Sequence, residues 1–226
     1  MQTLTLFLVR FRWHMAVFMF GAGSVASAQV VVTWQAATTN GIGTASGTPL
    51  LTGSLVELGM FTVNDATIQT NANNYGFLSA HFVIFDSAAI GTGSGAEGID
   101  GYWTRASPGN VSTDGIGVAG QRMYIWAFDT VSGATATQYG IYTSSLSSWL
   151  FPSDSSVPNT SQIDLNEVTS ILVGGFGTGT SSATGPSEPL YNLAAIAIPE
   201  PASTAMIAAL GALTLGLYRR RFLGRK

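Results

Sequence analysis

The side chains that could carry out a reaction are few, and they fit catalysis poorly. His81 is the single histidine between residues 29 and 198, and no G-x-S-x-G sequence supplies a serine for it to activate. The chain has no cysteine, which excludes thiolate catalysis, and one histidine cannot form a zinc site that needs three or four nitrogen or sulfur ligands. We therefore interpret His81 as a residue on the more polar face of a strand, and we expect a protein that is not an enzyme.

Carboxylates are the next candidates for chemistry. Asp164 and Glu167, in the sequence IDLNE, lie near enough in sequence to suggest the carboxylate pair of a glycosidase. The E-x-D-x-x-E pattern of jelly-roll glycanases is absent, however, and we expect Asp164 to begin a turn or a cap. Glycan hydrolysis is therefore the weakest of the functions considered.

A second group of carboxylates flanks a glycine-rich loop. Asp86, Glu97 and Asp100 could offer the hard oxygen ligands that Ca²⁺ prefers. No D-x-D-x-D-G loop accompanies them, so a solvated acidic loop is the leading interpretation. We predict no cofactor and keep Ca²⁺ as the alternative.

Aromatic side chains could bind sugars without a reaction, because exposed Trp and Tyr rings stack on sugar rings. Trp126 lies in an apolar run and is expected in the core. Trp103 and Tyr102, in the sequence IDGYWTR, stand beside Asp100 and Arg105. We therefore predict Trp103 and Tyr102 as the candidate carbohydrate contact.

The charge distribution excludes one class of partner. Only two arginines, Arg105 and Arg122, stand against eleven carboxylates between residues 29 and 198, a net charge of −9 with His81 neutral. A body with so few cations cannot neutralise phosphates. We expect no nucleic-acid partner.

The elements that must position these residues are short and β-rich. Runs of β-branched and aromatic residues alternate with Gly, Ser, Thr, Asn and Pro, and no helical period of useful length is present. The pattern predicts an all-β fold, an antiparallel β-sandwich or jelly roll over residues 29–185. The expected strands are Val30–Trp34, Ser54–Phe61, Phe77–Phe85, Gly101–Arg105, Arg122–Asp129, Gln138–Thr143, Ser148–Phe151 and Val168–Val173.

The sequence pattern makes a specific prediction for two of these strands. The run Arg122–Asp129 is apolar on both faces, which is typical of a central strand. In Phe77–Phe85 the alternating pattern places His81 on the more polar face. Residues 186–198 are expected to form either a linker or a last edge strand.

The two ends of the chain resemble targeting segments. Arg10 and Arg12, the apolar run Met15–Val25 and Ala26-Ser27-Ala28 predict a signal peptide over residues 1–28. Residues 202–218 carry no charge and would span about 25 Å as a helix, just short of a hydrocarbon core of roughly 30 Å, so we expect a marginal membrane-spanning helix. The basic tail 219–226 follows, and its Arg219, Arg220 and Arg221 are expected to hold it on the cytoplasmic side.

Pro199, Glu200 and Pro201 precede the apolar segment, and the order motif, helix, arginine cluster resembles the PEP-CTERM sorting signal of Gram-negative bacteria that make extracellular polysaccharide. The resemblance covers residues 198–226. It implies an exosortase, a membrane cysteine transpeptidase, as the partner that recognises the motif and processes the chain near it. The prolines would present Glu200 on a stiff extended segment.

The body shows a softer resemblance to the same family. The blocks SLVELGMF, RMYIWAFD, SSWLFP and IDLNEVTSILVGGFG resemble blocks of paralogous PEP-CTERM proteins of unassigned function. Together the resemblances imply an exported protein, inserted in the inner membrane as a precursor and then delivered to the cell surface or extracellular matrix, where polysaccharide is a potential partner. A structural or interaction role leads, and a carbohydrate-binding, lectin-like protein is the alternative.

Overall fold

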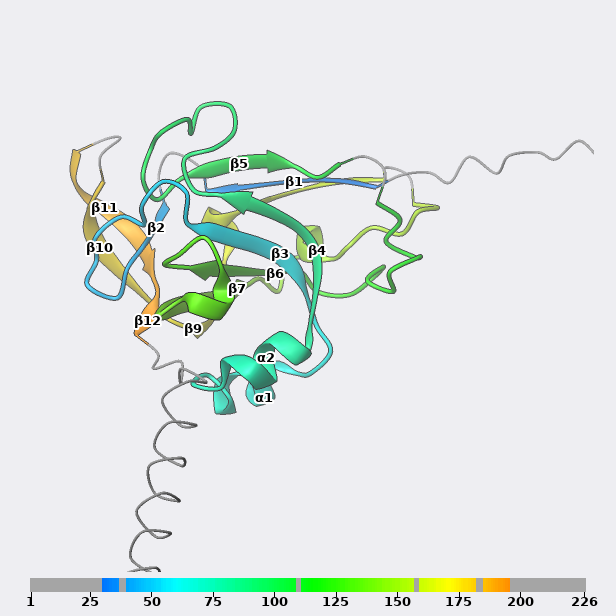
Figure 1. Ribbon diagram of the computed structural model, residues 1–226. Coiled ribbons are helices and arrows are strands. Elements are labelled where there is room, and N and C mark those ends of the chain that lie inside the picture. The colour runs from blue at the N-terminus through cyan, green and yellow to red at the C-terminus, as the bar shows by residue number, and fades with distance from the viewer. Residues whose placement is uncertain (1–29, 37–39, 109–110, 157–158, 182–184, 196–226) are drawn as a thin grey trace, which may run out of the picture.

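A computed structural model describes residues 30–36, 40–108, 111–156, 159–181 and 185–195, and most of its elements are strands arranged in three sheets (Figure 1). Two short α-helices interrupt them, α1 (Asp65–Thr70) and α2 (Tyr75–Ala80), and three 3₁₀ turns cover Gly133–Thr135, Ser147–Trp149 and Leu165–Glu167. The strands are β1 (Val31–Ala36), β2 (Gly41–Gly43), β3 (Leu55–Phe61), β4 (Phe82–Ala89), β5 (Trp103–Ala106), β6 (Tyr124–Phe128), β7 (Gln138–Thr143), β8 (Thr160–Asp164), β9 (Ser170–Val173), β10 (Gly175–Ser181), β11 (Gly185–Asn192) and β12 (Ala194–Ala195).

The largest sheet has six strands and is antiparallel. Its order is β12-β7-β6-β3-β4, and β9 pairs with β7 as well. All five residues of β6 are buried between β3 and β7. The prediction of a central strand in Arg122–Asp129 is therefore confirmed.

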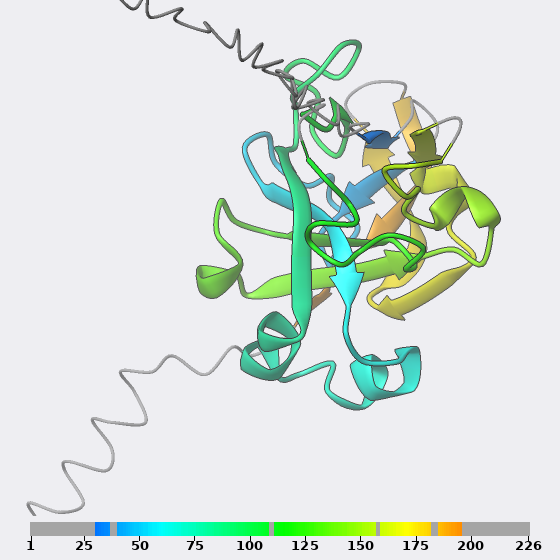
Figure 2. The same ribbon diagram turned by 90° about the vertical axis from the view of Figure 1, so that its right-hand side faces the viewer.

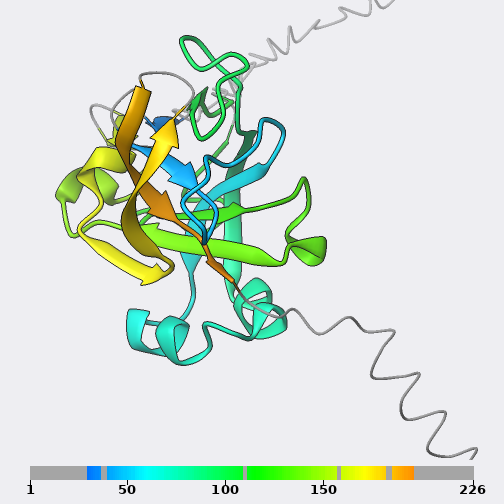
Figure 3. The ribbon, with the colours of Figure 1, turned by 90° about the vertical axis from the view of Figure 1, so that its left-hand side faces the viewer.

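The two smaller sheets each contain one parallel pair, so the prediction of an antiparallel fold is wrong for these two pairs, although the other strand pairs are antiparallel. One has the order β5-β1-β8, with β1 parallel to β8, and the other has the order β10-β11-β2, with β11 parallel to β2 (Figure 3). Parallel neighbours need a long crossover connection, and here most of the chain lies between the paired strands. Local patterns carry no trace of such pairing.

The main core lies between one face of the six-stranded sheet and the sheet β5-β1-β8. Trp34 of β1 and Trp103 of β5 pack edge to face, with ring centroids 5.7 Å apart, and Leu58 and Ile125 belong to the same cluster. Each fully buried side chain of this kind stabilises the fold by about 1.5–3 kcal/mol. Burial alone thus supports a fold that has no disulfide.

A second core lies on the opposite face of the six-stranded sheet, where residues 62–81 leave the sheet and return to it (Figure 2). Ile68 of α1 and Leu78 of α2 are buried against Trp126 and its neighbours. Asn64 caps α1 by accepting from the amide of Thr67 at 2.9 Å, and the caps satisfy amides that a helix leaves unpaired. The helical segment therefore belongs to the folded body.

The expected strand Phe77–Phe85 is wrong in its first half. Tyr75–Ala80 forms α2, which Asn74 caps by accepting from the amide of Phe77 at 3.0 Å, and β4 begins only at Phe82. His81 is consequently the residue that ends a helix, not a residue on a strand face. The run Ser148–Phe151 also differs, because Ser147–Trp149 is a 3₁₀ turn.

The folded body extends beyond residue 185, where the predicted sandwich ended. Gly175–Ser181 and Gly185–Asn192 form the hairpin β10–β11, and Leu190 is fully buried. Residues that were expected to form a linker or an edge strand thus lie in a strand up to Asn192, and β11 is the middle strand of its sheet. Strand β12 lies at the edge of its sheet, in agreement with the edge-strand alternative for residues 186–198, whereas strands β2 and β8 were not predicted.

Several predicted segments lie outside the described residues. These are the signal peptide 1–28, the motif Pro199-Glu200-Pro201, the apolar segment 202–218 and the basic tail 219–226. Within the part of the chain that the structure describes, none of the helices has the length and apolar character needed to cross a membrane.

Candidate functional site

The predicted carbohydrate contact is contradicted by burial. Trp103 is 0% exposed and Tyr102 is 3% exposed, and the Trp103 ring packs against Trp34 in the main core. Neither ring can stack on a sugar from this position. Trp126 is buried as expected, and so are Trp34 and Trp149, so no tryptophan among the described residues offers an open face.

The two carboxylates considered for glycan hydrolysis, Asp164 and Glu167, accept hydrogen bonds that hold other segments of the chain. Asp164 begins the 3₁₀ turn, as expected of a cap, by accepting from the amide of Asn166 at 2.9 Å. Its other oxygen accepts from Nε2 of Gln35 at 2.8 Å. Glu167 accepts from the indole N–H of Trp149 at 2.9 Å. Both carboxylates hold neighbouring segments in place.

The three carboxylates that suggested Ca²⁺ are bound separately by protein donors. Asp86 pairs with Arg105, Asp100 accepts from the amide and hydroxyl of Thr52, and Glu97 accepts from the amide of Gly95. Across the described ranges no three His, Cys, Asp or Glu side chains come together in a way that could hold a metal ion. The geometry gives the calcium alternative no support.

His81 is tied to its own helix. Its Nδ1 lies 2.8 Å from the carbonyl oxygen of Phe77, and its ring stacks on the Phe77 ring with centroids 4.2 Å apart. Both contacts fix the end of α2. They give His81 a local structural role.

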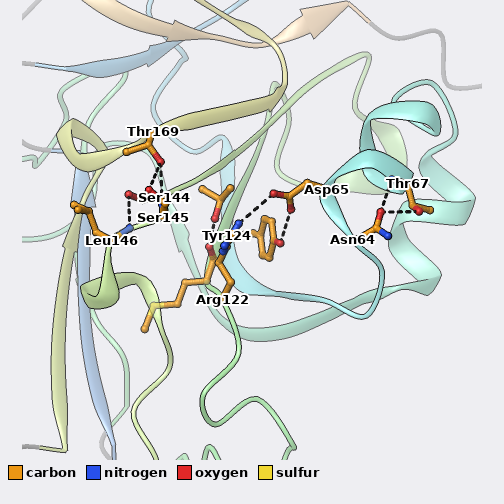
Figure 4. A network of polar contacts seen from close by, with 11 residues as sticks. Asn64, Asp65, Thr67, Arg122, Tyr124, Ser144, Ser145, Leu146 and Thr169 are labelled. Carbon is orange, nitrogen blue, oxygen red and sulfur yellow. Dashed lines mark hydrogen bonds and ion pairs between the residues drawn. The ribbon is translucent and has the colours of Figure 1, made fainter.

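A groove of about 560 Å³, lined by both apolar and polar side chains, lies where β3 leads into α1, beside the start of β6. Its centre is a contact between α1 and β6, made by Asp65, Arg122 and Tyr124 (Figure 4). The groove is lined by Phe61, Thr62, Val63, Asn64, Asp65, Ala66, Gln121, Arg122 and Tyr124. It combines charged, amide and apolar side chains, and we take it as the candidate binding site.

The centre of the groove is electrostatically balanced. Arg122 Nη1 lies 3.2 Å from Asp65 Oδ2, and the Tyr124 hydroxyl donates to Asp65 Oδ1 at 2.7 Å. Burial, reinforced by this hydrogen bond, raises the pKa of Tyr124 above its ordinary value. The Tyr124 hydroxyl therefore stays protonated near neutral pH and acts as a fixed donor, so the site suits binding better than proton transfer.

Sequence reasoning missed this groove because its parts are far apart in the chain. Asp65 is separated by 57 positions from Arg122 and by 59 from Tyr124. The one available signal was Arg122 itself, one of two cations in an acidic body. A cation in such a chain is expected to have a carboxylate partner, but the pattern does not identify which one.

Glu57 is a second unusual carboxylate. It lies on β3 opposite Trp126 of β6, and burial raises its pKa above the ordinary value. Within the described part of the chain its carboxylate accepts no hydrogen bond and has no cationic partner. The charged form of Glu57 is therefore disfavoured in the folded protein.

Glu57→Gln is expected to raise the melting temperature at pH 7.5, by on the order of 1 °C because the side chain is still partly hydrated. The raised pKa makes Glu57 cost stability as pH rises through its folded pKa. At pH 4, below the ordinary pKa of glutamate, the side chain is mostly protonated in both states, so most of the gain should be lost. Calorimetry at the two pH values measures both effects.

The matched control is Glu97→Gln, which removes the same charge from an exposed carboxylate that accepts from the Gly95 amide. It should leave the melting temperature unchanged or slightly lower. If Glu57→Gln behaves like this control at pH 7.5, burial does not disfavour the charge of Glu57.

The chain was compared with protein-family models, with curated proteins and with solved structures, and none of the three comparisons finds a match, so the assignment of function depends on the residues described above.

Proposed function

We propose that this protein is an exported structural or interaction protein of the cell surface or polysaccharide matrix, sorted by an exosortase. The observation that carries the proposal is the order of three features: Pro199-Glu200-Pro201, the uncharged residues 202–218 and the cluster Arg219–Arg221. Each feature is common by itself, and their order is specific. We propose no catalytic role.

The body is consistent with a scaffold. Two cores, a capped helical segment and carboxylates used as hydrogen-bond acceptors stabilise it without cysteine. The packing of the sheet β5-β1-β8 over one face of the six-stranded sheet supports a β-sandwich or jelly-roll-like architecture. Both arginines of the body are in ion pairs with carboxylates, which agrees with the proposal that nucleic acid is not a partner.

The position of the motif relative to the folded body favours processing close to the protein surface. The described body ends at Ala195 in β12, on the edge of the six-stranded sheet, and Pro199 follows four residues later. Four residues span at most about 14 Å. The proposed exosortase, together with the inner membrane, would therefore act near β12.

The test is an intact-mass measurement of the protein from producing cells with and without the exosortase. We expect a chain that lacks the segment after the Pro199–Pro201 region when the enzyme is present. Without the enzyme we expect a chain that keeps this segment. Retention of the same C-terminal end in both strains would contradict the sorting proposal.

A variant pair locates the signal. The triple change Pro199→Ala, Glu200→Ala, Pro201→Ala should prevent processing, whereas the double change Ser203→Ala, Thr204→Ala just beyond the motif should leave it intact. Equal processing of both variants would show that recognition does not use the motif.

The alternative function is carbohydrate binding, and one observation favours it. The groove at Asp65, Arg122 and Tyr124 offers hydrogen-bond donors and acceptors in fixed positions beside apolar side chains. The pair Asp164 and Glu167 gives no comparable support to hydrolysis, since both side chains are held in structural hydrogen bonds.

A further inference from the structure

We propose that the groove around Asp65, Arg122 and Tyr124 binds a neutral polyhydroxylated ligand, specifically a sugar residue of an uncharged glycan. The proposal goes beyond the sorting of the protein and does not depend on it, because none of the groove residues belongs to the C-terminal signal. It moves the carbohydrate contact away from Trp103 and Tyr102 to a surface that is accessible.

The acceptors of the groove are held in place before any ligand arrives. One carboxylate oxygen of Asp65 accepts a hydrogen bond from the Tyr124 hydroxyl, and the other accepts one from the Arg122 guanidinium. Each oxygen of an ionised carboxylate can accept a second hydrogen bond. The Asp65 side chain is 35% exposed, so this remaining capacity is open to a ligand hydroxyl at little ordering cost.

The donors lie beside these acceptors. A guanidinium has five N–H donors, and the contact with Asp65 uses Nη1 of an Arg122 side chain that is 42% exposed. The Gln121 side chain is exposed, and its side-chain carboxamide makes no hydrogen bond within the described residues. This carboxamide adds both a donor and an acceptor to the groove. Each hydroxyl of a sugar can donate and accept a hydrogen bond at the same time, which matches a groove whose donors lie beside its acceptors.

Charge selects a neutral ligand. Arg122 and Asp65 neutralise each other, and the body around them carries a net charge of −9. An anionic sugar would be repelled by the body and would meet no unpaired cation in the groove. A cationic sugar would have to displace Arg122 from Asp65.

Shape and lining fit a small sugar. The volume of about 560 Å³ lies within the range of roughly 300–1,000 Å³ that is usual for small-molecule sites. Phe61, Val63 and Ala66 add an apolar wall for the C–H face of a ring. Because the groove is open on one side, we expect a Kd on the order of 1 mM.

Another groove among the described residues offers fewer free donors. It measures about 430 Å³ and includes Arg105 and Val131. Arg105 gives both Nε and Nη2 to Asp86, each at 3.1 Å, so the edge of its fork is already occupied. Arg105 thus uses two of its five N–H donors on Asp86, whereas Arg122 uses one on Asp65, so Arg122 has more donors left for a ligand.

The test is a titration of the purified full chain with methyl glycosides of glucose, galactose and mannose, followed by saturation-transfer NMR. We expect binding of at least one of the three. We also expect glucuronate and glucosamine to bind at least fivefold more weakly. No binding of any methyl glycoside up to about 50 mM, or equal binding of the charged sugars, would overturn the proposal.

Three variants locate the site. Gln121→Ala should weaken binding by about threefold to tenfold, and Arg122→Lys, which keeps the charge but loses the planar fork, by at least fivefold. Gln69→Ala removes an exposed amide of α1 that does not line the groove and should change nothing. Gln121→Ala is decisive because it removes no side-chain hydrogen bond within the described residues, and equal affinities of Gln121→Ala and Gln69→Ala would place binding elsewhere.

Discussion

Gly93→Ala is expected to lower the free energy of unfolding by about 3 kcal/mol. Gly93 has φ +89°, a conformation that costs other residues roughly 1–2 kcal/mol. An added Cβ would also lie 1.7 Å from the carbonyl oxygen of Thr104 in β5. This oxygen belongs to the backbone and cannot rotate away, so overpacking adds about 1–3 kcal/mol. Urea denaturation of the purified chain measures the loss.

The loop between β4 and β5, which contains Gly93, also contains the residue for a matched control. Gly95 has φ +81°, but among the described residues no atom outside its two chain neighbours lies within 4 Å of an added Cβ. Gly95→Ala should therefore cost only the backbone term, about 1 kcal/mol. Equal losses in the two variants would mean that the loop does not pack on β5 as closely as described.

The central part of the fold could be predicted because its pattern is local. In β6 both faces are apolar, from Tyr124 to Phe128, and this is a property of consecutive residues that only a buried strand explains. The strands β1, β3 and β7 were recognised for a similar reason. When one or both faces of a strand are buried, the order of apolar and polar residues along the strand shows it directly.

The helical segment was missed because a short helix and a strand can share the same apolar positions. Leu78 and Ala80 alternate with polar residues, which is typical of a strand, yet Leu78 is buried as a helix residue. The signal that could have corrected the interpretation is Asn74, three positions before Phe77, at the position of a helix cap. A segment of six residues is too short for its hydrophobic period to distinguish a helix from a strand.

Two further features depend on partners that are distant in the chain. The strand β10 was not among the expected strands, and its place depends on distant partners, because Gly179 faces Leu190 and Gly47 so closely that an added Cβ would meet both. Trp103 has polar neighbours in sequence, yet its position under Trp34 is set by the pairing of β1 with β5. The groove at Asp65 is of the same kind, since the approach of α1 to β6 creates it.

Asp86→Ala is expected to lower the free energy of unfolding by about 3 kcal/mol, because this carboxylate joins two sheets. Asp86 lies on β4, and it accepts from the indole N–H of Trp34 in β1 at 3.0 Å and from Arg105 in β5. Its side chain is 5% exposed, whereas that of Arg105 is 41% exposed. Alanine would leave a buried indole N–H unpaired, at about 1–3 kcal/mol, and would break an ion pair whose carboxylate is buried and whose arginine is partly exposed.

Asp65→Ala is the matched control, because Asp65 also binds one arginine and one aromatic donor but lies at the surface. Exposed pairs contribute up to about 1 kcal/mol, so Asp65→Ala should cost clearly less than Asp86→Ala in the same urea experiment. Asp86→Asn keeps an acceptor for Trp34 and loses the charge that holds Arg105, so an intermediate loss is expected. Equal losses for Asp86→Ala and Asp65→Ala would contradict the argument, since the indole of Trp34 would then have to find another acceptor or water when Asp86 is removed.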